Sequence, residues 1–337
     1  MTRPFEGRPP PGGRLHATAP QAGRPAALRE PADRTARAAV QVGEVVLGDH
    51  LCLTYDSDAE RYAVLAAYLR DGLAARHRVL YLADEDDPDA VLSRLAAAVA
   101  ASGVPGTERL DLRAAAEAGD LVVRSIVDAF LDGGRFDPDR TAALLGAEID
   151  RALAQGHLGV RVTGENSFSL RGWPGGDRLA DLERHGRLTL RAGDARATAL
   201  CQYDRRWFDP GQLRVLEDCH DGQVRVDDLY DDRVLRITPM FTPPGLRLTG
   251  AIDESTLPAL HDALVRATGR AGHFCLDLSG LEFCDMAGLD LLLRAGRLGP
   301  GPDRQVVLRG APSYLGLMMD IGGRHAAPGV HREEAPR

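Results

Sequence analysis

The sequence contains no lysine, few aromatic residues and no long hydrophobic run. All 41 of its lysine-or-arginine positions are arginine, and 49 aspartates and glutamates outweigh them to give a net charge of −8. Nonspecific binding to nucleic acid needs clustered positive charge against the phosphates, so this balance argues against direct nucleic-acid binding. No apolar run reaches the roughly 18 residues of a membrane span, and the N-terminus lacks the apolar core of a signal peptide. We therefore expect a cytoplasmic protein with no membrane association.

Cysteine is also scarce and irregularly spaced. The five cysteines are Cys52, Cys201, Cys219, Cys275 and Cys284, and no two of them form a CxxC pair. An odd number without paired spacing predicts neither a disulfide framework nor a structural zinc motif. We expect small buried thiols in a reducing compartment, with no metal and no cofactor.

The length and composition predict two globular domains. The chain has 337 residues, of which 44% are hydrophobic and 27% charged, which is ordinary for folded domains. Shifts in composition divide it into a disordered Pro/Gly/Ala/Arg-rich tail (1–42), a first domain (43–206), a polar connector (207–240), a second domain (241–325) and a flexible end (326–337).

The first domain is predicted to be an α/β fold. Short apolar runs alternate with amphipathic helical stretches, the runs lying near residues 45–55, 78–82, 121–123, 160–164 and 197–203. This alternation predicts βαβ units and a mostly parallel sheet with helices on both faces. Ligands of such sheets bind beyond the carboxyl ends of the strands, so the segments 55–60, 84–87, 164–166 and 203–206 are candidate binding loops.

A candidate ligand pocket follows from this rule. The side chains expected at its mouth are His50, Cys52, Tyr55, Asp84, Glu85, Glu165 and Tyr203, with Trp173 either lining its apolar part or packing in the core. His50 and Glu165 also have simpler interpretations, as a structural histidine and as a loop-binding carboxylate. A Cys/His/Glu metal site at this mouth stays open as an alternative, although the spacing shows no ligand signature.

The second domain carries the most informative segment, residues 276–292. A hydrophobic strand with an internal Asp277 is followed by a short loop and a helix that starts near Asp285. Asp285 is suited to cap the free N–H groups of that helix. The segment resembles the STAS family, named for sulfate transporters and anti-sigma-factor antagonists. The residues that match the family's pattern are Asp277, Leu278, Phe283, Asp285, Gly288 and Leu292.

The STAS resemblance implies a small α/β signalling module that docks a regulatory protein, such as an anti-sigma factor or its kinase. It places the docking surface at Asp285, Met286, Ala287 and Gly288. In phosphorylated antagonists the modified Ser or Thr directly precedes the glycine, a position occupied here by Ala287. Alanine has no hydroxyl, so phosphorylation there is chemically excluded. Ser255 and Ser279 are alternative targets elsewhere in the domain.

The first domain resembles the MEDS family, sensory domains of methanogens and methylotrophs that are thought to sense small hydrocarbon derivatives. The motifs that carry the resemblance are residues 48–52, 79–85, 162–167 and 200–204, in that order. The family is similar to RecA-type ATPases, whose P-loop needs glycines and a lysine. The equivalent turn here, 55–61, has no glycine, no lysine and three carboxylates. The resemblance therefore implies a RecA-like fold that senses a small apolar ligand, and the missing P-loop predicts no ATPase activity.

The combined prediction is a non-catalytic signalling protein. A sensory first domain would bind a small ligand or partner and bias a second domain that docks a regulatory protein. Two alternatives remain open at this point. One is a divergent RecA-like nucleotide hydrolase, with Glu165 as its catalytic carboxylate. The other is a constitutive scaffold that binds no ligand.

Overall fold

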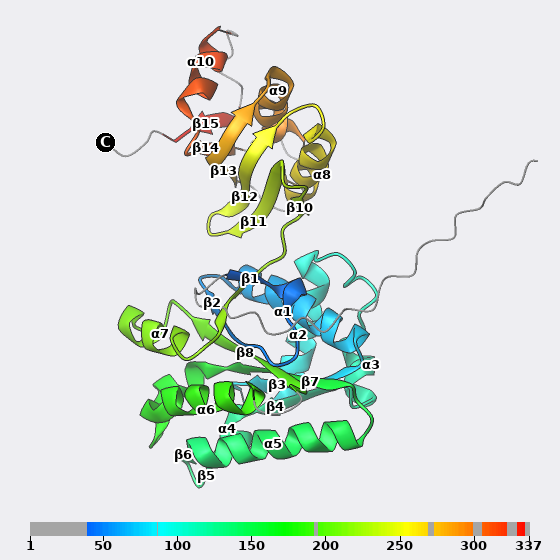
Figure 1. Cartoon of the computed structure of the whole chain (residues 1–337), viewed down its shortest axis with the longest axis vertical. Helices are drawn as coiled ribbons and strands as arrows, with labels where there is room; N and C mark the ends of the chain where they lie inside the picture. Colours follow the sequence, from blue (N-terminus) through cyan, green and yellow to red (C-terminus); the bar gives the residue numbers. More distant parts are fainter. Residues whose placement is uncertain are drawn as a thin grey trace, which may run out of the picture. The chain divides into compact units, whose positions relative to one another are not determined.

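The computed structural model of the chain describes residues 39–85, 87–191, 195–268, 273–298, 305–321 and 329–333. Most of the predicted N-terminal tail, 1–38, and parts of the predicted flexible end, 326–328 and 334–337, lie outside the described residues. The described residues fold into two α/β domains, each built on one large sheet (Figure 1), which confirms the predicted fold class.

The first sheet has seven strands, all parallel, in the order β1-β9-β2-β8-β7-β3-β4. The strands are β1 (Ala39–Gln41), β2 (His50–Tyr55), β3 (His77–Ala83), β4 (Leu121–Ser125), β7 (Gly159–Glu165), β8 (Ala197–Asp204) and β9 (Gly222–Arg225). A short hairpin of β5 (Leu131–Asp132) and β6 (Arg135–Phe136) lies apart from this sheet.

Helices cover both faces of this sheet (Figure 1). They are α1 (Asp58–Ala74), α2 (Pro88–Ser102), α3 (Leu112–Glu117), α4 (Ile126–Phe130), α5 (Pro138–Ala154), α6 (Leu179–Arg191) and α7 (Pro210–Glu217). Alternate residues of a strand point to opposite faces, so Leu51 and Leu53 join the core with α1 and α2. Cys52 joins a second core with α6 and α7. The two-sided burial explains why these strands are continuous apolar runs in the sequence.

The predicted tail and connector need correction at two places. Most of the segment 207–240 is part of one domain or the other, because α7 packs in the first core, β9 pairs with β1 and β2, and residues 230–231 and 235–240 pair within the second sheet. Likewise, β1 lies within the segment predicted to be a disordered tail. Both strands are very short, so they carry almost no periodic signal. Val40 of β1 and Val224 of β9 are buried in the first core because the two strands, far apart in sequence, pair with each other.

The second sheet has six strands in the order β10-β11-β12-β13-β14-β15. Its strands are β10 (Tyr230–Asp231), β11 (Leu235–Phe241), β12 (Pro244–Ile252), β13 (His273–Cys284), β14 (Gln305–Arg309) and β15 (Val330–Arg332), and its helices are α8 (Leu257–Thr268), α9 (Met286–Arg294) and α10 (Ser313–Ile321). β10 to β12 are antiparallel, and β12 to β15 are parallel. Since β15 pairs with β14, part of the predicted flexible end is a strand.

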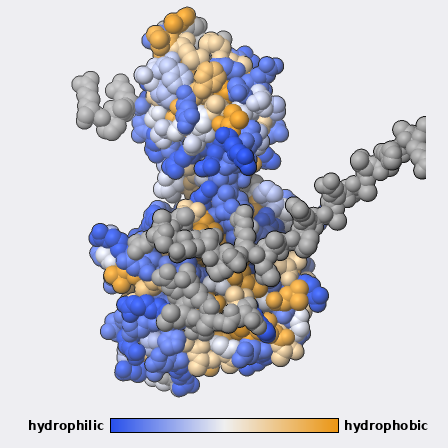
Figure 2. All heavy atoms as spheres, viewed as in Figure 1, coloured by the Kyte–Doolittle hydropathy of each residue, from blue (hydrophilic) through white to orange (hydrophobic). Residues whose placement is uncertain are grey.

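The surface of both domains is largely hydrophilic in the view of Figure 2. A hydrophobic patch lies over α10, where Leu317 and Ile321 are exposed. Among the described residues, no helix combines the length and the apolar character that a membrane crossing requires.

Candidate functional site

The carboxyl edge of the first sheet is crossed by ion pairs. Glu165, at the end of β7, pairs with Arg61 of α1 at 2.5 Å and accepts a hydrogen bond of 2.7 Å from the Tyr81 hydroxyl. The Arg61 guanidinium also lies over the Tyr55 ring, 5.5 Å from its centroid. Asp84, after β3, pairs with Arg171 at 3.1 Å. Glu165 and Asp84, both predicted at this edge, are therefore each paired with an arginine.

The turn from β2 to α1 is acidic where a P-loop would cradle phosphates. Ser57 caps α1 by accepting a hydrogen bond from the backbone N–H of Glu60. Arg206 is held between Asp58, at 2.8 Å, and Asp204, at 2.6 Å. These carboxylates surround the helix N-terminus, which is the position that favours an anionic ligand in nucleotide-binding folds. Both carboxylates are paired with the Arg206 guanidinium.

A second polar group is buried between the sheet and α6. Glu183 of α6 is 3% exposed, and its Oε2 lies 3.0 Å from His50 Nε2 and 3.5 Å from His220 Nε2. The Cys201 thiol donates to the same oxygen at 3.3 Å and lies 3.5 Å from His50 Nε2. We call these four side chains the Glu183 cluster. They come from β2, β8, α6 and the turn after α7, and their ligand atoms all lie within 4.8 Å of one another.

The other carboxylate oxygen of Glu183 is occupied separately. Its Oε1 accepts hydrogen bonds from the Tyr203 hydroxyl at 2.5 Å and from Asn166 Nδ2 at 3.1 Å. His220 Nδ1 lies 2.7 Å from the Leu216 carbonyl oxygen. Its Nε2 is buried and has no hydrogen-bond partner among the described residues. Tyr203 and Asn166 thus hold one carboxylate oxygen of Glu183 from outside the cluster. His50, His220 and Cys201 face the other oxygen, Oε2.

Burial and the close contacts among its members shift the pKa values in the Glu183 cluster. Burial, and then the neighbouring His220, lower the pKa of His50 against the opposing pull of Glu183. Burial alone would raise the pKa of Glu183, but His220 and His50 hold it well below its usual range. Burial and the Glu183 charge raise the pKa of the Cys201 thiol well above its usual value. The two histidines therefore favour the ionised form of the Glu183 carboxylate, although the side chain is buried.

The site in the second domain lies where two parallel strands end. Ile252 of β12 and Cys284 of β13 are register partners, and the backbone N–H of Asp285 donates to the Ile252 carbonyl at 3.0 Å. Asp285 is the N-cap of α9 and accepts a hydrogen bond of 2.7 Å from the backbone N–H of Gly288. A Cβ at Gly288 would collide with Ile252 and lie 3.0 Å from Cys284 Sγ, so the helix start fits only a glycine there.

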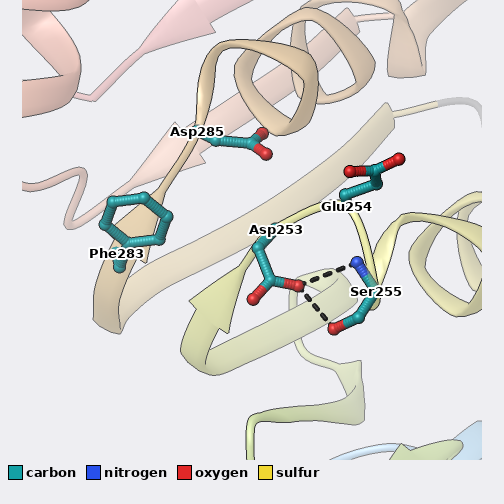
Figure 3. A pocket seen from close by; sticks show the side chains of 5 residues that line it. All are labelled: Asp253, Glu254, Ser255, Phe283 and Asp285. Carbon is teal, nitrogen blue, oxygen red and sulfur yellow. Dashed lines mark hydrogen bonds between the residues drawn. The ribbon is translucent and has the colours of Figure 1, made fainter.

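An open hollow of about 590 Å³ lies beside this helix start. It is lined by Asp253, Glu254, Ser255, Phe283 and Asp285 (Figure 3), and Asp253 accepts hydrogen bonds from the backbone and hydroxyl of Ser255. Phe283 is 51% exposed, and Met286, next to the hollow in sequence, is 48% exposed. The surface therefore combines two exposed apolar side chains with three carboxylates.

Comparison with known protein families accounts for both domains. The model described as "MEDS: MEthanogen/methylotroph, DcmR Sensory domain" matches residues 49–221, which is just over half of the chain. The chain belongs to the MEDS family. A second model, "Mlab, STAS domain", matches residues 240–324. The predicted order of a MEDS domain followed by a STAS domain is confirmed, and it makes the chain a signalling protein.

Comparison with solved structures finds distant neighbours. A KaiC-like protein from the hyperthermophilic archaeon Pyrococcus horikoshii OT3 is 13% identical, with a TM-score of 0.38, over 60% of this chain and 88% of that chain. No curated protein matches the sequence significantly.

The residues predicted for one pocket in the MEDS domain fall into two groups. Tyr55, Asp84 and Glu165 lie at the carboxyl edge of the sheet, as expected. His50, the first residue of β2, points to the face of the sheet that α6 covers, where it meets Glu183, whereas Tyr55, the last residue of β2, packs in the core on the opposite face. His50 lies with Tyr203 at the Glu183 cluster. The two sets therefore do not converge on a single mouth.

The remaining predicted residues lie around these two groups. Cys52 is buried on the face of the sheet that α6 covers, and its thiol donates to the Gly222 carbonyl at 3.5 Å. Trp173 packs against the same core. Glu85 is exposed and pairs with Arg94 at 2.6 Å. These positions favour the core alternative for Trp173 and a surface ion pair for Glu85.

Two members of the Glu183 cluster, Glu183 and His220, were not predicted from the sequence, and Cys201 was noted only as a cysteine. One signal for Glu183 exists. It stands four residues after Leu179, directly after Leu182, and so falls on the apolar stripe of α6 that faces the core. A glutamate on such a stripe is buried and needs partners. His220 carries no comparable signal, because its role depends on the path of the chain after α7.

Proposed function

We propose that this protein transmits a signal from its MEDS domain to a regulatory protein docked on its STAS domain. An anti-sigma factor or its kinase is the partner class that fits best, so the output would be transcription regulation in the cytoplasm. The observation that carries the proposal is the start of α9, where exposed Phe283 and Met286 flank the capping Asp285.

The identity of residue 287 supports unswitched docking. Ala287 is exposed in the first turn of α9, at the position of the modified hydroxyl in phosphorylated relatives. A phosphate there would add a charge of about −1.5 to −2 beside Asp285. That added charge would change which partners can bind to this surface. With alanine, the surface keeps one charge state. Control of docking then belongs to the MEDS domain, to Ser255 or Ser279, or to the supply of partner.

The docking proposal is tested by partner capture from the native cell with the full chain. We expect Met286→Asp to remove a regulatory protein that the wild-type chain retains, because a charge replaces an apolar contact. Leu317→Asp is the matched control, since Leu317 is an exposed apolar residue of α10 in the same domain. If the wild type and Met286→Asp retain the partner equally, or if only Leu317→Asp loses it, the docking surface is not at the start of α9.

The MEDS domain is proposed to sense rather than to catalyse. The carboxylates at the turn from β2 to α1 and the ion pair of Glu165 with Arg61 support this view. The opposing hypothesis is nucleotide hydrolysis with Glu165 as the catalytic carboxylate. ATP and GTP turnover by the full chain decides between them. We expect no hydrolysis above the buffer rate, whereas hydrolysis that disappears in Glu165→Gln would establish an enzyme.

A further inference from the structure

The Glu183 cluster has the donor set of a transition-metal site. Two imidazole nitrogens, one thiol and one carboxylate oxygen are contributed by His50, His220, Cys201 and Glu183. Zinc in proteins takes N, S and O donors of these kinds at about 2.0–2.3 Å in a tetrahedral arrangement. Ligand atoms placed so would be about 3.3–3.6 Å apart. Four of the six separations within the cluster are 3.0, 3.3, 3.5 and 3.5 Å, and all six are within 4.8 Å, so side-chain adjustments of about 1 Å would bring the four atoms to this spacing.

The orientation of His220 is that of a metal ligand. Its Nδ1 lies 2.7 Å from the Leu216 carbonyl oxygen, an acceptor, so Nδ1 carries the proton and donates it there. Its Nε2 faces Glu183 Oε2 from 3.5 Å. In this buried site the two atoms need a positive charge between them, which is supplied either by a proton on Nε2 or by a metal ion. Metal-bound histidines are commonly oriented by such a bond from their other ring nitrogen to a backbone carbonyl.

The Glu183 carboxylate is also oriented by hydrogen bonds, which it accepts at the oxygen that faces away from the other three ligands. The Tyr203 hydroxyl and the Asn166 amide occupy Oε1, whereas His50, His220 and Cys201 all face Oε2. Hydrogen bonds to the non-coordinating oxygen are a common outer shell of a coordinating carboxylate. The charge also balances, because a divalent ion with the Glu183 carboxylate and the Cys201 thiolate has no net charge. Burial of such a set costs far less than burial of an unpaired carboxylate.

We propose that the Glu183 cluster binds one divalent transition-metal ion, and that zinc is the ion its donors suit best. A thiolate with two imidazoles selects against magnesium and calcium, which need oxygen ligands. The four ligands come from β2, β8, α6 and the turn after α7, so the ion would fasten α6 and that turn to the sheet. The inference concerns the MEDS domain alone and does not depend on docking at α9.

The test uses the purified full chain, stripped with a chelator and titrated with zinc against a chromogenic competitor. We expect one zinc ion per chain and a rise in Tm on binding. Cobalt as a probe should give visible bands of a tetrahedral site and a thiolate-to-cobalt charge-transfer band. Cys201→Ser should abolish the charge-transfer band and weaken zinc binding by more than about 100-fold, beyond the usual loss from removing an outer-shell partner.

Cys52→Ser is the matched control, because Cys52 is a buried cysteine on the neighbouring strand whose thiol bonds to the Gly222 carbonyl. This variant should bind zinc and cobalt as the wild type does. His220→Gln provides a second variant in case Cys201→Ser does not fold, and it too should lose zinc affinity while retaining the thiol. Substoichiometric zinc binding by the wild type, or equal binding by Cys201→Ser and Cys52→Ser, would overturn the proposal. Either result would leave the proposed docking function untouched.

Discussion

The Tyr203 hydroxyl donates a hydrogen bond of 2.5 Å to Glu183 Oε1, and both side chains are buried. Tyr203 comes from β8 and Glu183 from α6, so this bond joins the sheet to the helix that covers it. Glu183 also accepts from Asn166 and Cys201 and lies 3.0 Å from His50. A single carboxylate is therefore the common acceptor of a network whose members are far apart in sequence.

Removal of this carboxylate should strongly destabilise the MEDS domain. In Glu183→Ala the donors around it remain buried without an acceptor, so we expect the free energy of unfolding to fall by about 3–5 kcal/mol. Urea unfolding in the presence of a chelator measures this loss without any contribution from bound metal. Glu85→Ala removes an exposed ion pair with Arg94 and should cost about 0–1 kcal/mol. Equal losses in the two variants would show that the network is not a source of stability.

Asp285 has a capping role that can be separated from its charge. Asp285→Ala removes the acceptor for the Gly288 N–H and should lower the stability of the STAS domain by about 1 kcal/mol. Asp285→Asn retains a capping oxygen, so its Tm should stay close to the wild-type value. If the carboxylate contacts a basic partner, Asp285→Asn should weaken docking and reduce its dependence on salt. Thermal unfolding and binding at two salt concentrations measure the two effects in the same variants.

Gly288 should tolerate no side chain. In Gly288→Ala the new methyl group meets Ile252 and Cys284 at the helix start, and we expect a loss of about 1–3 kcal/mol from overpacking. Gly146→Ala is the contrasting change, because a Cβ at this helical glycine of α5 meets nothing within 4 Å. It should stabilise its domain by roughly 0.5–1 kcal/mol. Calorimetry of both variants compares the directions of the two Tm shifts, and a stabilised Gly288→Ala would contradict the close packing at α9.

The histidine at the start of β3 should make stability depend on pH. Burial, and then the charge of Arg161, lower the pKa of His77 to about 4 from its ordinary 6.5. The unfolded chain therefore takes up a proton at His77 before the folded chain does, and stability falls as the pH falls from 6.5 to 4. We expect His77→Gln to reduce this fall by on the order of 1–2 kcal/mol. Chemical unfolding at pH 7 and pH 4.5 measures it, and parallel pH profiles for both proteins would exclude the effect.

The fold was predictable where the apolar runs are long. Strands such as β3 and β7 are buried on both faces, so their sequences are continuous enough to mark a parallel sheet without any contact information. β1 and β9 are three and four residues long, and only their mutual pairing identifies them. This is why the boundaries at the predicted tail and connector failed while the order of the longer elements held.

The candidate site was predictable only in part, for a related reason. The strand-end rule located Tyr55, Asp84 and Glu165, because the carboxyl ends of parallel strands meet at one edge. The Glu183 cluster lies on a face of the sheet, where ligands come from a helix and from a turn after another helix. Glu183 is surrounded in sequence by Asp181, Arg184 and His185, and these charges give its neighbourhood the appearance of a solvated surface.

The position of β9 between β1 and β2 affects how the chain can fold as it is made. The N–H of Gly43, just after β1, bonds to Asp227, just after β9, across 184 residues. At about 5–20 residues per second, roughly 10–40 s pass between synthesis of the two. Throughout that interval β1 has no neighbour and β2 has an open edge, which is the condition that favours aggregation or chaperone binding. A fragment that ends before Gly222 would remain in that state, so the synthesis of β9 sets the earliest point at which this edge of the MEDS domain can close.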